Sequence, residues 1–430
     1  QEVLIVTLVN SAVDNFTQRI GEFLKERGLL PHLNYRVRTL HGLAHDIVRE
    51  RPALVGLDSN FQIIDEREAN RVRTNAAEEW LYQHPTALDD YLDSEMDEGK
   101  KNWVRREKLP SLVDELAHQF IRSAKNKHLT PNDIRQRLDE VPIPLPLAEA
   151  GLEIYESYQH SLAYRGAVDF DDLIRLAYQA LQLDEDLLNR LRHQWPYILE
   201  DEAQDSSQVQ EEILRLLAQN WVRVGDPNQA IYETFTTADP QLLRDFINEA
   251  DFARTLPTSG RSTTSIISLA NELVRWSRAQ HPLKEARDAL SPPEIRPTGP
   301  DDHQPNPPDR PDQIHLIEKK YTPQGELRTI VKSLQQWLPD HPEETVAVLV
   351  PRNFRAQHLA DLLRKKGIEP VESLLSSTSN TRKTAGALGN ILAYLANPGS
   401  ANKLASVYRV WRRDDKQNTE AWEAVKDNTD

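Results

Sequence analysis

The spacing of apolar residues along the first 75 residues alternates between two periods. Short apolar runs at residues 3–8 and 35–40 predict buried strands, whereas residues 13–27 and 43–49 repeat apolar positions at helical spacing. Strands that alternate with helices are typical of a parallel sheet covered by helices. The opening of the chain therefore predicts an α/β fold.

The pattern changes between residues 76 and 160, where the chain is polar and helical. Aromatic residues lie in this stretch, among them Trp80, Tyr82, Tyr91 and Trp103, together with the basic pairs Lys100-Lys101 and Arg105-Arg106. We expect a helical insertion here. Its basic residues either face a nucleic acid or form an ordinary solvated helix face.

An α/β pattern resumes near Ala167. Apolar runs predict strands around Tyr197, Trp221 and Phe252, and residues 208–217 predict an amphipathic helix between the first two of these strands. These strands extend the sheet that is predicted at the start of the chain.

A second unit is expected from residue 257. It contains a proline-rich stretch, in which eight of the 27 prolines fall between residues 291 and 311. Such a composition favours an exposed loop or linker. Beyond it, residues 313–317 and 345–350 predict strands, and residues 354–366 predict a helix that ends at Gly367.

Composition limits the class of protein. A chain of 430 residues is too long to fold around one hydrophobic core, so we expect more than one domain. Its content of 39% hydrophobic and 28% charged residues is typical of globular domains. No apolar run approaches the roughly 18 residues of a membrane span, and no secretory signal is present, so we expect a cytoplasmic protein without a membrane partner. The absence of cysteine excludes disulfides and thiolate metal sites.

The net charge of −15 argues against a broad nucleic-acid surface, because Lys and Arg make the contacts to phosphate. It does not argue against a narrow groove for a single strand. There, base stacking and a few local charges suffice.

Two strings carry the candidate chemistry. Residues 197–205 read YILEDEAQD, and residues 224–232 read VGDPNQAIY. Each follows an apolar strand, at the end where open α/β sheets place ligands. In the first string Asp201 can hold a magnesium ion while Glu202 orients or deprotonates a water, the two tasks that phosphoryl transfer requires. Taken singly, an Asp-Glu pair is also ordinary surface charge, and Gly-Asp-Pro-Asn is also a turn.

Together these strings resemble the second and third motifs of superfamily 1 helicases of the UvrD/Rep type. Further segments resemble other motifs of that family in the same order: residues 4–12 (motif Ia), 38–42 (motif Ib), 169–173 (the DFDDL segment), and 259–262 with 270–271 (motif IV). The resemblance covers nearly the whole chain.

The resemblance implies two RecA-like P-loop NTPase domains, both incomplete, with helical insertions. The first would comprise residues 1–75 and 161–256, interrupted by the insertion at 76–160. The second would begin at 257–390, and residues 391–430 would start another helical insertion.

The chain departs from the family at both ends. It begins at Gln1, and no G-x-x-x-x-G-K-[ST] phosphate loop occurs anywhere in it. Nothing after Ala393 resembles motifs V and VI. We therefore expect an internal fragment that is inactive alone.

The resemblance also implies roles at the nucleotide. Asp201 and Glu202 would serve magnesium and the attacking water, Gln229 would sense the γ-phosphate, and Asp226 would lie beside the nucleotide. Arg261 would clamp phosphate oxygens, which suits a planar guanidinium. Gln229 could instead stabilise a turn and Arg261 could be a surface residue, since Ser259-Gly260 stands where Asn-Tyr is commoner in the family.

Five residues would contact DNA by the same resemblance. Tyr232 and Phe235 would stack on bases, and Asn10, Thr39 and His41 would touch the strand. Core packing of Phe235 and a structural His41 are the alternatives. The acidic residues Asp169, Asp171 and Asp172 would link the two sites, or cap a helix.

The implied function is that of an ATP-dependent DNA helicase or single-stranded DNA translocase with 3′–5′ polarity in repair or recombination. It would use ATP and Mg²⁺ on single-stranded or duplex DNA, with repair or recombination proteins as partners. The alternative is a non-catalytic, helicase-like DNA-binding scaffold subunit.

Overall fold

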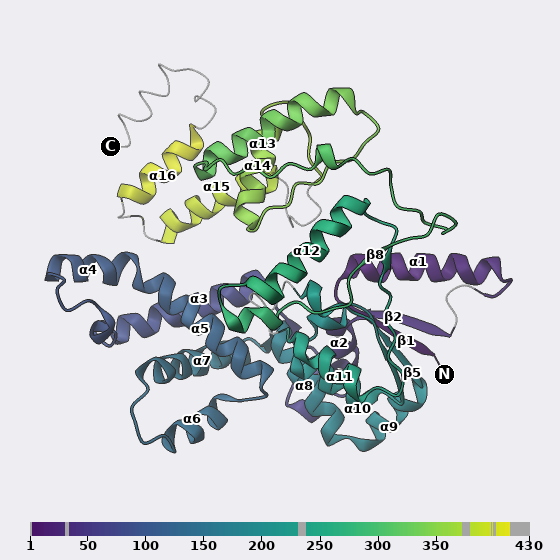
Figure 1. Ribbon diagram of the computed structural model, residues 1–430. Helices are drawn as coiled ribbons and strands as arrows, with labels where there is room; N and C mark the ends of the chain where they lie inside the picture. The colour runs from purple at the N-terminus through teal and green to yellow at the C-terminus, as the bar shows by residue number, and fades with distance from the viewer. Residues whose placement is uncertain are drawn as a thin grey trace. The chain divides into compact units, whose positions relative to one another are not determined.

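The computed structural model describes residues 2–30, 34–230, 238–371, 379–396, 398 and 401–412 (Figure 1). The chain divides into two compact units, Gln1–Pro311 and Asp312–Asp430. The first unit contains the sheet and most of the core, and it is an α/β unit with a parallel sheet, as predicted.

A four-stranded parallel sheet organises the first unit. Its order is β2-β1-β5-β6, built from β1 (Val3–Thr7), β2 (Tyr35–Thr39), β5 (Tyr197–Glu200) and β6 (Asn220–Arg223). β1 pairs with β2 on one side and β5 on the other (Figure 1). The four strands predicted from apolar runs are confirmed, and their carboxyl ends lie along one edge of the sheet.

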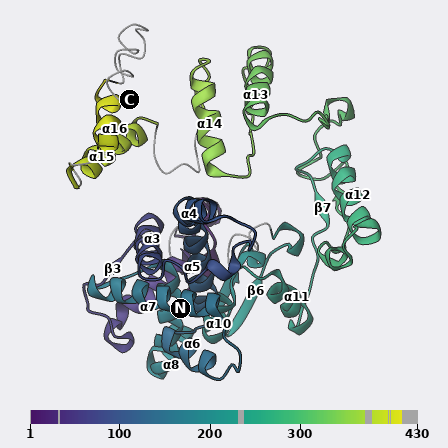
Figure 2. The ribbon, with the colours of Figure 1, turned by 90° about the vertical axis from the view of Figure 1, so that its left-hand side faces the viewer.

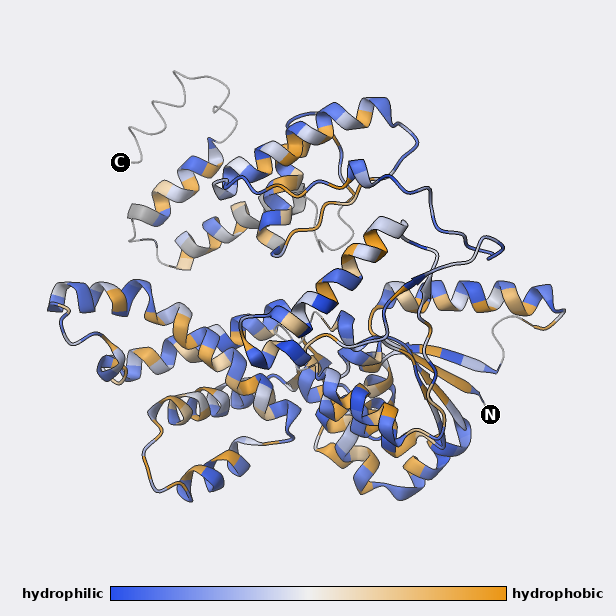
Figure 3. Cartoon of the chain, viewed as in Figure 1, coloured by the Kyte–Doolittle hydropathy of each residue, from blue (hydrophilic) through white to orange (hydrophobic). Residues whose placement is uncertain are grey.

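One face of this sheet is covered by helices. These are α2 (Leu40–Glu50), α8 (Phe170–Leu183), α9 (Glu185–Gln194) and α10 (Gln208–Leu217). Leu4, Val6 and Ile198 of the sheet are fully buried in their shared core. Hydrophobic residues gather around the strands and these helices in Figure 3. The amphipathic helix predicted at residues 208–217 is confirmed by α10.

The opposite face of the sheet is more open. Helix α1 (Asn10–Glu26) packs beside β2. The side chains of Tyr197, Val222 and Val224 are about half exposed, at 52%, 49% and 51%. Within the described residues no strand pairs with the outer edge of β6. An apolar face and an unpaired edge are therefore both accessible here.

A helical module is inserted in the chain between β2 and β5. It consists of α3 (Glu66–Gln83), α4 (Glu98–Glu107), α5 (Leu109–Asn126), α6 (Pro131–Asp139) and α7 (Pro146–Tyr164). Helices α3, α5 and α7 pack on one another around a core of their own (Figure 2). The module begins and ends at a short parallel pair, β3 (Gln62–Ile63) and β4 (Ala167–Val168).

A buried ionic cluster joins this module to α8. Lys125 Nζ lies 2.5 Å from Asp169 and 2.9 Å from Asp172, and its side chain is 1% exposed. Tyr158 donates a hydrogen bond to Asp169 as well (2.6 Å). Burial opposes charge on Asp169, but Lys125 outweighs it and holds the pKa of that carboxyl below its usual value. Asp169 also caps α8 by accepting from the Asp172 N–H, so the capping interpretation is confirmed.

The remainder of the first unit is less regular. It contains α11 (Pro240–Glu249), α12 (Thr264–Gln280) and a short parallel pair, β7 (Thr258–Ser259) with β8 (Arg296–Pro297). Asn306 of the proline-rich stretch donates to the carbonyls of Ser259 and Ser262, at 2.6 and 2.8 Å. That stretch is therefore tied to the chain at β7.

Three predicted strands are wrong. Residues around Phe252, 313–317 and 345–350 are irregular in the described structure. Phe252, Leu316 and Leu349 are almost fully exposed. An apolar run becomes a strand only when another strand satisfies its N–H and C=O groups, and these runs have no such neighbour among the described residues.

The second unit, Asp312–Asp430, is helical where it is described. Helices α13 (Pro323–Trp337) and α14 (Asn353–Arg364) share a small core, and α15 (Ser379–Ala396) and α16 (Ala401–Trp411) follow. Gly367, at φ +77°, follows α14 in the left-handed conformation, which confirms the predicted helix end. Short 3-10 turns complete both units: η1 (Pro52–Val55), η2 (Asp89–Tyr91), η3 (Ala203–Asp205), η4 (Pro227–Gln229), η5 (Lys284–Asp288), η6 (Pro311–Gln313) and η7 (Leu338–Asp340).

We predict that Lys125→Ala strongly destabilises the first unit. Removing the cation leaves Asp169 and Asp172 buried without a partner, which lowers the free energy of unfolding by about 3–5 kcal/mol. Urea denaturation of wild type and variant measures this. The control Arg71→Ala removes an arginine that is 68% exposed, and it should change stability by no more than about 0.5 kcal/mol. Equal effects of the two variants would contradict the prediction.

Candidate active site

Backbone hydrogen bonds continue past the ends of the central strands and build the site. The Asp201 N–H donates to the Val6 carbonyl (2.9 Å), which aligns the ends of β5 and β1. The Val224 N–H donates to the Glu200 carbonyl (2.8 Å), and the Ala203 N–H donates to the Val224 carbonyl (3.0 Å). The loops after β5 and β6 are therefore held side by side at the carboxyl edge of the sheet.

Asp201 and Glu202 occupy the first residues after β5. Glu202 has φ 54° and ψ 41°, a left-handed conformation that is uncommon for a residue with a side chain. Burial, and then the charge of Glu202, raise the pKa of Asp201 above its usual value. Two adjacent carboxylates with this electrostatic penalty are suited to a divalent cation, which would relieve it.

The two carboxylates Asp201 and Glu202 suit magnesium, which needs few protein ligands, better than a metal whose ligands all come from protein side chains. Within the residues that the structure describes, no cluster of three or more His, Asp, Glu or Cys side chains could hold an ion. Magnesium usually takes one or two carboxylates and completes its shell with water and substrate phosphates. Asp201, with Glu202 beside it, supplies that kind of partial site.

Gln204 belongs to the site, although the sequence analysis assigned it no role. Its side chain is buried, and Nε2 donates to Glu202 Oε2 at 2.7 Å. Its Oε1 accepts from the Asp226 N–H at 3.0 Å. One amide thereby connects the Glu202 carboxylate to the loop after β6. The signal was present in the D-E-A-Q string, but only the fold shows the second partner.

Gly225 allows the two loops to approach each other. A Cβ at this position would lie 2.5 Å from Gln204 Oε1 and 2.9 Å from Leu243 Cδ2. Both distances are shorter than a Cβ atom's van der Waals contacts allow, so a neighbouring atom would have to shift. The glycine is therefore required by close packing against Gln204.

The loop after β6 folds its polar side chains back on itself. Asp226 accepts from the Asn228 N–H (2.9 Å) and from Gln229 Nε2 (3.0 Å). Asn228 in turn donates to the Ser291 carbonyl (2.7 Å). Gln229 is exposed, and its bond to Asp226 stabilises the turn, as the alternative interpretation of this residue holds.

Arg261 lies in the bend after β7 and is exposed. No hydrogen bond or ion pair joins it to Asp201, Glu202 or Gln229 in the part of the chain that the structure describes, so the predicted set is only partly brought together. Gly260 has a local reason, because a Cβ there would meet the Gln304 carbonyl oxygen at 1.9 Å. This contact explains why a small residue precedes Arg261.

The predicted DNA contacts fall into three groups. Thr39 caps α2 by accepting from the Gly42 N–H (3.0 Å), and Asn10 is exposed at the start of α1. His41 packs edge-on against Phe170 with ring centroids 5.5 Å apart, and burial lowers its pKa. Tyr232 and Phe235 lie outside the described residues.

A cavity of about 270 Å³ opens beside His41 at the same edge of the sheet. Leu8 and His41 line it together with two acidic residues, Asp171 and Asp205. Burial, with the neighbouring charge of Asp169, raises the pKa of Asp171 to about 6. Burial, with the neighbouring charge of Glu202, raises the pKa of Asp205 to about 6 as well. The cavity therefore adjoins the loop that carries Glu202.

The basic string of the helical module is partly neutralised. Arg105 forms an ion pair with Asp89 at 2.5 Å, and Lys101 lies 3.8 Å from Glu98. Trp80 is buried and donates to Glu153, whereas Tyr82 and Trp103 are exposed. These contacts favour the solvated-face interpretation for Lys101 and Arg105.

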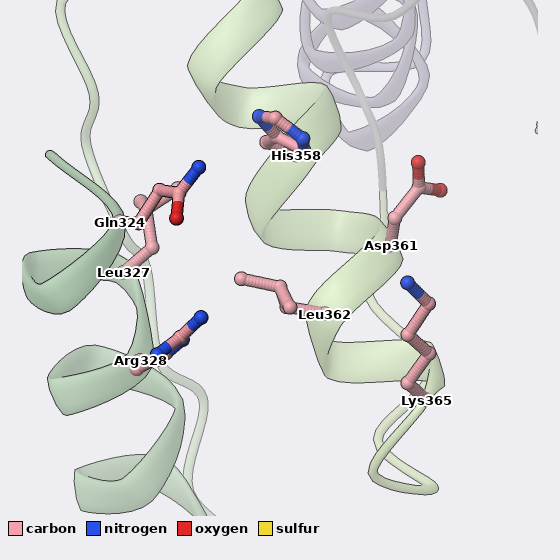
Figure 4. A pocket seen from close by; sticks show the side chains of 7 residues that line it. All are labelled: Gln324, Leu327, Arg328, His358, Asp361, Leu362 and Lys365. Carbon is pink, nitrogen blue, oxygen red and sulfur yellow. The ribbon is translucent and has the colours of Figure 1, made fainter.

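A separate hollow of about 290 Å³ lies in the second unit between α13 and α14. In Figure 4 Leu362 of α14 points toward Leu327 and Arg328 of α13, whereas Asp361 and Lys365 are drawn on the other side of α14. Arg328 and Lys365 share it with Asp361 and with apolar residues. None of the predicted site residues lines it.

The geometry points first to a class of protein. An open parallel sheet with paired carboxylates after one strand and a second polar loop beside it is typical of α/β proteins that bind nucleotides at the strand ends. In agreement, a sequence profile described as the UvrD/REP helicase N-terminal domain matches residues 1–251. The chain belongs to the UvrD/REP helicase family.

Individual relatives agree with this assignment. DNA helicase II of Salmonella typhimurium is 28% identical over 279 residues, which is 63% of this chain and 34% of the relative. ATP-dependent DNA helicase PcrA of Leuconostoc citreum is 30% identical over 287 residues, 66% of this chain and 34% of the relative. The chain thus spans about a third of the length of these relatives.

Within the described residues, no helix is both long and apolar enough to cross a membrane.

We predict that Gly225→Ala disturbs the site more than the fold. The added methyl group would meet Gln204 Oε1 and must shift the amide whose Nε2 bonds to Glu202. Magnesium affinity at the carboxylates should therefore fall about tenfold, equal to about 1.4 kcal/mol. Titration with Mn²⁺ as a paramagnetic probe measures this. Gly99→Ala, in helix α4 of the inserted module, is the control, since its added Cβ would meet only Asp97 Oδ1. Unchanged affinity in Gly225→Ala would contradict the prediction.

We predict that Asp205→Asn flattens the dependence of stability on pH. The pKa of Asp205 is raised to about 6 in the folded chain, above the value of about 3.9 expected when it is unfolded. Between these values the folded chain binds more protons, so this group's destabilising contribution is greatest at neutral pH and disappears as pH falls. Urea midpoints at several pH values in EDTA, with the exposed Asp58→Asn as control, measure the slope. A slope equal to that of wild type would contradict the assignment.

Proposed function

We propose that the protein carrying this chain is an ATP-dependent DNA helicase or single-stranded DNA translocase. Residues 1–75 and 161–256 are its first RecA-like domain, and 76–160 its helical insertion. Residues 257–390 begin a second RecA-like domain, and 391–430 begin a second insertion. One observation carries this proposal. The Gln204 side chain donates to Glu202 and accepts from the Asp226 backbone N–H, and so couples the two loops at the strand ends.

Each site residue then has a task. Asp201, with Glu202 beside it, holds magnesium, which when bound neutralises charge on the phosphates. Glu202 orients and deprotonates the attacking water, and Gln204 keeps its carboxylate aimed. Gln229, released from Asp226, can donate to a phosphate oxygen and accept from water at once, since an amide does both. Arg261 supplies positive charge to the phosphates from beyond β7.

The DNA strand crosses the same edge of the sheet. Asn10 and His41 lie at the starts of α1 and α2, and His41 lines the same cavity as Asp205. Thr39 positions His41 by capping α2. Tyr232 and Phe235 stack on bases, which requires little sequence discrimination. The relatives' names, DNA helicase II and ATP-dependent DNA helicase PcrA, support DNA as the substrate and ATP as the fuel. On the family resemblance of the motifs alone, we extend the proposal to 3′–5′ movement and to a setting in repair or recombination with partner proteins.

The experiment is ATP hydrolysis by the full-length protein with and without single-stranded DNA. Glu202→Gln removes the base while preserving size and the bond from Gln204, so turnover should fall by a factor of about 10²–10⁴. Glu272→Gln, a carboxylate that is 67% exposed on α12, is the matched control and should retain full activity.

Three results would be informative. DNA-stimulated turnover that is lost only in Glu202→Gln supports the motor. Turnover unaffected by Glu202→Gln removes the proposed base. DNA binding without any turnover favours a helicase-like scaffold subunit instead.

A further inference from the structure

A second buried ionic cluster lies directly behind the candidate active site. Glu200 and Arg223 are the last residues of β5 and β6, and they are paired across the sheet. Their side chains are 1% and 0% exposed, and Arg223 Nε lies 2.7 Å from Glu200 Oε2. Arg223 Nη1 donates to Glu211 Oε2 of α10 at 2.6 Å. One guanidinium thus bridges two strands and a helix.

The surroundings of Arg223 keep it in one orientation. Its guanidinium carbon lies 4.6 Å from the ring centre of Trp221 and 5.0 Å from that of Phe246. A buried carboxylate such as that of Glu200 needs its cationic partner, so the three charged groups hold one another in place.

One hydrogen bond from this cluster and one from the residue after Arg223 hold the loop after β5. Ser206 donates to Glu200 Oε1 at 2.6 Å, which ties the far end of the loop back to the strand that precedes it. The Ala203 N–H bonds to the Val224 carbonyl, one residue after Arg223. Glu202, in its left-handed conformation, directly precedes Ala203. Such a conformation persists only where the surroundings impose it.

We propose that Arg223, Glu200 and Ser206 are positioning residues that hold Glu202 in its strained, catalytically useful conformation. The inference rests on the proposed function, in which Glu202 acts on water. It adds to that function a second layer of residues, which touch neither nucleotide nor metal. Because a small displacement of a catalytic group causes a large loss of rate, these residues should affect turnover more than substrate affinity.

The test uses Ser206→Ala and Arg223→Lys in the full-length protein. Ser206→Ala removes one hydroxyl and keeps the ion pairs, so it preserves the fold even if Arg223→Lys does not. Arg215→Ala is the control, because Arg215 binds the same Glu211 from the surface and is 51% exposed. Two quantities are measured: amide hydrogen exchange across residues 201–207, and the kcat and KM for ATP.

We expect exchange of the Ala203 amide to be about tenfold faster in Ser206→Ala, with kcat about tenfold lower and KM within about twofold of wild type. Arg215→Ala should match wild type in both measurements. Unchanged exchange, or faster exchange with unchanged kcat in an active protein, would overturn the inference. A wild type that hydrolyses no ATP refutes the proposed function instead, and the exchange rates alone then decide whether the cluster holds the loop.

Discussion

The arrangement of the candidate site depends on the parallel pairing of β1, β5 and β6. In a parallel sheet every strand ends at the same edge, so loops far apart in sequence are brought together there. The ladder continues beyond the strands through the Asp201 N–H to the Val6 carbonyl and the Ala203 N–H to the Val224 carbonyl. A slip of one residue would turn Asp201 to the opposite face. The positions of the candidate site's side chains therefore depend on the register of the strands.

Two buried cations reinforce this frame at different places. Lys125 joins the inserted helical module to α8, and Arg223 joins β5 and β6 to α10. Neither can be left without its carboxylates, because an unpaired charge in the interior is strongly unfavourable. Both clusters act as specific connectors between elements that apolar packing alone would hold less definitely. The cluster around Arg223 also stands next to the residue with the strained backbone, Glu202.

The open face of the sheet is the other physical feature of the first unit. Tyr197, Val222 and Val224 expose apolar surface, and the outer edge of β6 presents unpaired N–H and C=O groups within the described residues. Surfaces of this kind usually receive another strand or helix. Val222 and Val224 lie next to Gly225, so part of this apolar surface borders the candidate site.

The sequence by itself determined the four sheet strands, the helix at 208–217, the end of α14 and the two polar strings, because apolar periodicity and turn residues act over a few neighbouring positions. It failed at Phe252, since a strand needs a partner that no local pattern reveals. Only the tertiary structure decided that Gln204 bridges two loops, that Gly225 must be small, and that Lys125 pairs with Asp169 across 44 residues. Such pairings arise from which elements pack together, and packing is a property of the folded chain as a whole.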